Sequence, residues 1–102
     1  MSRSFYRSTV NNIIKIFNVL KKAEEDSEMM TISKIASITG IHKWSVSRTI
    51  DLYMSSFVEI TVPEHLEDVG LQLKIVRLKD PDTKIEQVSN YIKMSKNLET
   101  EI

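Results

Sequence analysis

A cluster of side chains suited to contacting nucleic acid lies in the segment TGIHKWSVSRTIDLY, residues 39–53. Its members are two cations, two short hydroxyls and the only tryptophan of the chain: Lys43, Arg48, Ser45, Ser47 and Trp44. A guanidinium can fork onto a guanine edge or bind a phosphate, whereas an ammonium more often contacts phosphate. Short hydroxyl side chains let the backbone approach base edges. Because apolar residues alternate with this cluster at helical spacing, we expect one face of a helix to pack and the other to bind.

Three side chains in this region also have a purely structural interpretation. Arg48 could pair on the helix surface with Asp51, three residues later, for roughly a few tenths of a kcal/mol. Trp44 could pack its ring on the domain edge instead of stacking against sugars and base methyls. His42 fits the first residue of a helix as well as a DNA contact. The residues by themselves leave these alternatives open.

Residues for catalysis or metal binding do not assemble in this sequence. There is no cysteine, and there are only two histidines and two isolated glycines, which do not form a phosphate-binding loop. His65 could bind a metal with its neighbours Glu64, Glu67 and Asp68, but one loop is a poor cage for an ion. We therefore expect neither an enzyme nor a protein with a metal or another cofactor.

The composition is that of one globular domain. With 102 residues, of which 41% are apolar and 27% charged, the chain can bury a core with little margin. The absence of cysteine excludes a disulfide framework and fits an intracellular protein. No apolar run is long enough to span a bilayer, and the N-terminus MSRSFYRS lacks the core of a signal peptide. We expect a single domain over residues 1–102, in the cytoplasm of a cell or, if the chain is viral, of the host.

The formal net charge is zero, but the charges are segregated along the chain. Residues 1–23 carry five cations and no acid, and residues 24–28 follow with four acids. Local patches, rather than the net charge, would therefore set any attraction for nucleic acid.

Apolar residues at helical spacing predict a long N-terminal helix over residues 9–25. Val10, Ile13, Ile14, Phe17 and Leu20 form its stripe, and Ile16 and Val19 lie off it. A helix that is apolar on two sides needs two partners. Either a second subunit supplies one of them, or the small core wraps around the helix.

A short strand and a pair of helices are expected next. Residues 29–32 fit the strand, Ser33 fits a helix N-cap, and Gly40 fits the left-handed turn that ends this second helix. The third helix should start at residue 42 or 43. Its expected inward residues are Val46, Ile50 and Tyr53, with Thr49 and Met54 beside them.

Alternation with period two predicts a strand pair in the second half of the chain. One apolar set is Val58, Ile60 and Val62, and the other is Leu71, Leu73 and Ile75. Residues 63–70 between them are too many for a two-residue turn, which indicates a looped hairpin. A last helix is expected over residues 83–98. Its apolar residues are Ile85, Val88, Tyr91, Ile92 and Leu98.

The stretch ISKIASITGIHKWSVSRTI, followed by this strand pair, resembles the winged helix-turn-helix family. The resemblance rests on small Ala36, on Gly40 four residues later and on Val46 six after that. It implies an α+β fold that is mainly helical, a winged helix-turn-helix with additional N- and C-terminal helices. The implied segments are the N-terminal helix at 9–25, the helix-turn-helix at 33–54, the wing hairpin at 57–79 and the C-terminal helix at 83–98.

The resemblance also implies a function, sequence-specific binding of double-stranded DNA by a small homodimeric transcription regulator. The implied DNA-binding residues are His42, Lys43, Trp44, Ser45, Ser47 and Arg48, with Lys34 and Lys74 nearby. One residue departs from the family pattern, because Thr49 stands where an aliphatic side chain is usual; Ile50 is then expected to take the inward position. A winged helix that binds only protein is the alternative, since fold does not fix function.

The tip of the expected wing is acidic and would repel phosphates. Its carboxylates are Glu64, Glu67 and Asp68. This loop could instead bind another protein. The expected basic support for DNA then comes from Lys34, Lys74, Arg77 and an N-terminal arm with Arg3 and Arg7.

The apolar surface of the first and last helices exceeds what one small core needs, so we expect these helices to form the homodimer. The expected interface residues are Ile13, Ile16, Phe17, Leu20, Val88, Tyr91 and Ile92.

Overall fold

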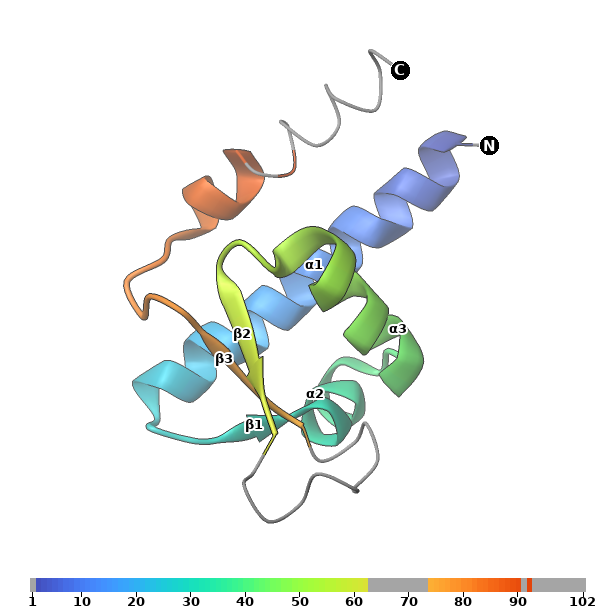
Figure 1. Ribbon diagram of the computed structural model, residues 1–102. Helices are drawn as coiled ribbons and strands as arrows, with labels where there is room; N and C mark the ends of the chain where they lie inside the picture. Colours follow the sequence, from blue (N-terminus) through green and yellow to red (C-terminus); the bar gives the residue numbers. More distant parts are fainter. Residues whose placement is uncertain (1, 63–73, 91, 93–102) are drawn as a thin grey trace.

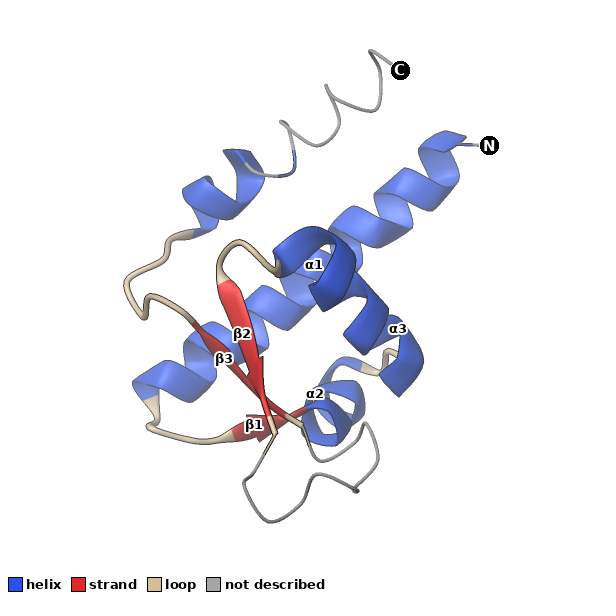
Figure 2. Ribbon diagram, in the orientation of Figure 1, coloured by secondary structure: helices blue, strands red, loops and turns tan. Residues whose placement is uncertain are grey.

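A computed structural model of the chain describes residues 2–62, 74–90 and 92, with side chains from residue 8 onward. It is an α+β fold, mostly helical, with a small antiparallel sheet (Figures 1 and 2). The elements are α1 (Ser2–Glu25), β1 (Met30–Thr31), α2 (Ile32–Thr39), α3 (Lys43–Thr49), the π-helical η1 (Ile50–Met54), β2 (Val58–Thr61) and β3 (Ile75–Leu78). The predicted class is confirmed at this level.

Helix α1 has packing partners on two sides within the chain. It contacts α2, α3 and η1 as well as strand β3. Ile16, which lies off the predicted stripe, is 0% exposed, and Val19 packs against the same core. The core therefore wraps around α1, the second of the two alternatives that the sequence leaves open. The helix also begins at Ser2 instead of residue 9, so the segment with Arg3 and Arg7 is helical and not an extended arm.

The sheet has the strand order β1-β3-β2, and both pairings are antiparallel. Val58 lies opposite Leu78 and Ile60 opposite Val76, which puts these four side chains on the inner face. The predicted alternation is confirmed for Val58 and Ile60. Val62 is exposed.

The alternation predicted for β3 has the wrong phase. The set ending in Ile75 was expected to face the core, but Val76 and Leu78 are the buried residues of this strand. Each of the two alternating sets of residues contains apolar side chains here. The pairing of β3 with β2 therefore decides which set faces inward. Leu71 and Leu73, like the loop at 63–70 with its acidic tip, lie outside the described residues.

Helix α2 is capped by Thr31 and not by Ser33. The Thr31 backbone is extended, and its Oγ1 accepts a hydrogen bond from the Lys34 N–H at 3.1 Å. Strand β1 ends at Thr31, and the helix follows it directly, so Ser33 lies inside the first turn. The sheet pairing of β1 thus decides where the helix begins, since Thr31 and Ser33 are both good capping residues.

The chain returns from the sheet to α1 through a turn at Asp80. The Thr83 N–H and hydroxyl both donate to the Asp80 carbonyl, at 3.0 and 2.8 Å. Lys21 on α1 donates from its Nζ to the carbonyls of Pro81 and Thr83. Residues 85–90 are helical, so the last helix starts two residues later than expected because Thr83 belongs to the turn. Val88 is buried, whereas Leu98 lies outside the part that the structure describes.

Candidate nucleic-acid interface

The turn between α2 and α3 is built from residues 39–41. Gly40 has a left-handed backbone with φ of 76°, as expected, and its N–H donates to the Ala36 carbonyl at 2.9 Å. Thr39 Oγ1 donates to the Ile35 carbonyl and accepts from the Ile41 N–H, at 2.7 and 3.2 Å. The turn therefore ends α2, and its hydrogen bonds hold the backbone that leads into α3.

His42 is the N-cap of α3. Its Nδ1 accepts a hydrogen bond from the Trp44 N–H at 3.2 Å, while its carbonyl accepts from the Val46 N–H at 2.9 Å. An acceptor at this position satisfies one of the amides that a helix start leaves unpaired. The helix-start interpretation of His42 thus has a direct structural basis.

The inward face of this helical segment runs along Val46, Thr49, Ile50 and Met54, which are all buried. Tyr53, expected inward, is half-buried, and Met54 takes the deeper position. The cause is the π-helical turn of η1, in which each residue advances the helix by a smaller angle than in an α-helix. The position one turn beyond Ile50 is therefore Met54. Thr49 and Ile50 both face inward, so the threonine does not displace Ile50.

The outward face of α3 and η1 carries a stripe of exposed side chains. Trp44, Arg48 and Leu52 follow one another at intervals of four residues, and each is exposed. Trp44 is 64% and Leu52 60% exposed. Ser45 and Asp51 are also exposed, and Lys43 and Ser47 are half-buried at the edge of the stripe. The structure brings the predicted cluster together on one face.

Leu52 and Asp51 are members of this face that the sequence analysis did not assign to it. Asp51 was considered only as a partner of Arg48, and Leu52 was not considered. The signal for Leu52 was its spacing of four residues from Arg48, which places both on one side of a helix.

The cations differ in whether they have acidic partners. Among the described residues, neither Lys43 nor Arg48 forms an ion pair, so the alternative in which Arg48 pairs with Asp51 is not present. Lys34, in contrast, pairs with Glu28. Lys43 and Arg48 are thus two cations on α3 without an acidic partner in the described part of the chain.

Two further residues that were expected to support a DNA contact, Arg77 and Lys74, differ in their surroundings. Arg77 lies between Glu24 and Glu59, with nitrogen–oxygen distances of 3.8 and 3.9 Å. Lys74 is half-buried, and its carbonyl accepts from the Ile32 N–H at 3.1 Å. Arg77 thus faces two carboxylates, whereas Lys74 forms no ion pair within the described residues.

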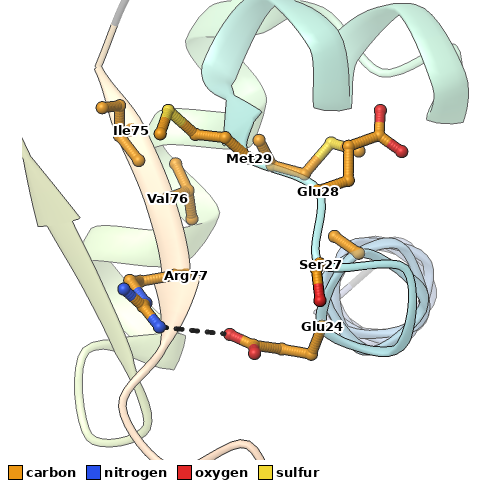
Figure 3. A pocket seen from close by; sticks show the side chains of 9 residues that line it. Glu24, Ser27, Glu28, Met29, Ile75, Val76 and Arg77 are labelled. Carbon is orange, nitrogen blue, oxygen red and sulfur yellow. Dashed lines mark ion pairs between the residues drawn. The ribbon is translucent and has the colours of Figure 1, made fainter.

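A cavity of about 320 Å³ lies where the end of α1 meets β1 and β3. Figure 3 shows Glu24 and Arg77 facing each other there as an ion pair. The remaining lining residues are Ala23, Ser27, Glu28, Met29, Met30, Ile75 and Val76. Glu24 and Arg77 neutralise each other in this ion pair, so neither offers an unpaired charge to a ligand in the cavity.

Most of the expected dimer-interface residues belong to the core of the single chain. Ile13, Ile16, Phe17, Leu20 and Val88 are buried without any partner chain, and Ile92 is half-buried against the same core. Because these side chains are already covered within one chain, they leave little surface to offer a second subunit in this conformation. Tyr91 lies outside the described residues.

Other kinds of site are not supported in the part of the chain that the structure describes. No three histidine or carboxylate side chains there come together as a metal site, and the expected metal candidate around His65 lies outside that part. Nor does any helix there combine the length and apolar character needed to cross a membrane. Neither family models, curated proteins nor solved structures match this chain.

Proposed function

We propose that this chain is a winged-helix protein that binds double-stranded DNA sequence-specifically and regulates transcription as a homodimer. Support for the fold comes from the order of helices and strands, the β1-β3-β2 sheet and the glycine turn between α2 and α3. In this proposal α3 is the recognition helix and enters the major groove, which accepts one α-helix. The loop between β2 and β3 takes the place of the wing.

The observation that carries the proposal is the unpartnered positive charge on the outward face of α3. Lys43 and Arg48 are free of ion pairs within the described chain and both lie on α3, whereas other exposed cations without an ion pair there, such as Lys15 and Lys79, lie on other segments. Arg48 lies at the centre of the exposed stripe, so its guanidinium can reach a guanine edge. Lys43 lies at the start of the helix, a suitable place for a phosphate contact.

The electrostatic part of binding should be modest. With Lys43 and Arg48 from each of two protomers, about four phosphate or base contacts would carry positive charge to the DNA. If all four neutralised phosphates, the logarithm of the binding constant would fall with a slope of roughly −4 against the logarithm of salt concentration. A much steeper slope would mean that cations outside α3 dominate the contact.

The dimer must use surface that remains accessible in one chain. On α1, Val10 and Ile14 are only half-buried, and Ile85 on the last helix is exposed. Figure 1 shows the N-terminal half of α1 extending past the sheet and α2. In this proposal a two-fold axis there relates two copies of α3, which must lie about one helical turn of DNA apart to enter successive major grooves. Light scattering that shows a monomer at micromolar concentration would remove this part of the proposal.

Selection from a random pool of duplexes, followed by titration of the selected duplex, tests the DNA-binding proposal. We expect an inverted repeat to be enriched. Arg48→Ala should weaken binding by about 5- to 150-fold for each half-site, the range for one bidentate base contact. Its stability should change little, because Arg48 is exposed and free of ion pairs in the described chain.

The matched control is Lys15→Ala, which removes an exposed cation of α1. It should leave the affinity nearly unchanged. Equal losses in the two variants would point to non-specific attraction, and an unaffected Arg48→Ala would mean that α3 is not the recognition helix.

The second candidate function is a protein-binding module. It is favoured by the exposure of Trp44 and Leu52 on either side of Arg48, because tryptophan and arginine are enriched at the centres of protein interfaces. The same selection distinguishes the two functions. No enriched duplex and no salt-dependent binding would leave this face available for a protein partner.

A further inference from the structure

Trp44 exposes more apolar surface than a helix start normally does. It is the only tryptophan of the chain, and 64% of its surface is exposed. Its backbone is held in place, because its N–H donates to His42 Nδ1. A large exposed aromatic ring beside cationic side chains is typical of a contact surface.

The place of Trp44 on α3 suggests what the ring contacts, provided that the proposed function holds. Recognition helices contact base edges mainly with residues near their N-terminal end. Trp44 is the second residue of α3, and the cations on either side of it are Lys43 and Arg48. In the major groove, the feature that an apolar side chain can recognise is the C5-methyl group of thymine.

We propose that Trp44 contacts the methyl group of a thymine close to a guanine bound by Arg48. Four residues of α-helix rise about 6 Å, and successive base pairs lie roughly 3.4 Å apart. The two side chains therefore reach bases no more than about two pairs apart. The recognised half-site contains a thymine within this distance of the guanine, on either strand.

Leu52 offers a matched comparison on the same face. It is almost as exposed as Trp44, at 60%, but lies two turns further along, in the π-helical turn of η1. At the far end of the helical segment its side chain is expected to lie away from the base edges. If DNA binding needed only exposed apolar surface, both residues would contribute to affinity. A contact with a thymine methyl group involves Trp44 alone.

Replacing thymine by uracil tests the contact, because it removes the methyl and keeps base pairing. Each thymine of the selected duplex is replaced in turn, and affinity is measured by fluorescence anisotropy of labelled DNA. Uracil at the contacted position should weaken binding about fourfold, the factor for burying one methyl group. Trp44→Ala should bind the thymine and uracil duplexes equally. Trp44→Phe and Leu52→Ala should both keep a preference for thymine.

The emission of Trp44 provides an independent measurement on the unmodified protein. Since no other tryptophan is present, its fluorescence should change when the selected duplex is added and should saturate at the same concentration as the anisotropy. Unchanged emission at saturating DNA would overturn the contact.

Each outcome separates this inference from the function on which it rests. If the duplex binds and Arg48→Ala weakens it, but uracil has no effect near the guanine, DNA binding stands and the Trp44 contact is wrong. A selected site that has no thymine within that distance overturns the contact in the same way. If no duplex binds at all, the proposed function fails and the inference fails with it.

Discussion

Replacing Ile16 by alanine tests whether α1 uses this residue within its own chain. The side chain is 0% exposed and belongs to the buried cluster of the domain. The change removes three carbon groups, worth about 2.4 kcal/mol at roughly 0.8 kcal/mol each. The cavity left behind raises the expected loss of unfolding free energy to about 3 to 4 kcal/mol. For a domain of this size the total is on the order of 5 to 15 kcal/mol, so the loss is a large fraction.

Thermal and urea unfolding, followed by circular dichroism, measure this loss. The midpoint temperature should fall by about 15 °C or more. Ile14→Ala is the matched control, because it removes the same atoms from a half-buried position on the same helix. It should cost no more than about 1.5 kcal/mol, half or less of the Ile16 effect. If Ile16→Ala instead keeps the parent's unfolding midpoint and only lowers the association state, Ile16 lies between subunits and the packing of α1 described above is wrong.

The remaining predictions concern the turn, the cap and an ion-pair cluster. Gly40→Ala should cost about 1 to 2 kcal/mol of unfolding free energy, from backbone strain alone, because φ is 76° and nothing lies within 4 Å of the added Cβ; Gly40→Asn should cost less in the same urea titration. His42→Ala should cost about 0.5 to 1 kcal/mol by removing the acceptor of the Trp44 N–H, and equal stability of His42→Ala and His42→Asn would argue against that cap. Arg77→Ala should cost less than about 1 kcal/mol in thermal unfolding, because its two ion pairs are long and its side chain is 58% exposed.

Local features of the chain were predicted well because neighbouring residues determine them. The left-handed turn at Gly40, the start of α3 at Lys43 and the strand at 58–61 follow from glycine, capping and period-two patterns. These signals depend on backbone sterics and on side chains a few residues apart. The predictions that were wrong in detail, such as the Ser33 cap and the phase of β3, depend on pairing between distant strands.

The sequence by itself determined which side chains α3 can offer, since residue types and a spacing of four are enough to place Trp44 and Arg48 on one face. Only the tertiary structure decided which cations are free to use. Arg77 meets Glu24 and Glu59, which are 53 and 18 residues away in the chain, and no local pattern could indicate that. The tertiary structure also decided that α1 is packed on two sides from within the chain, which leaves Val10 and Ile14 half-buried. Burial and charge pairing depend on which surfaces meet, and the fold brings those surfaces together from distant segments.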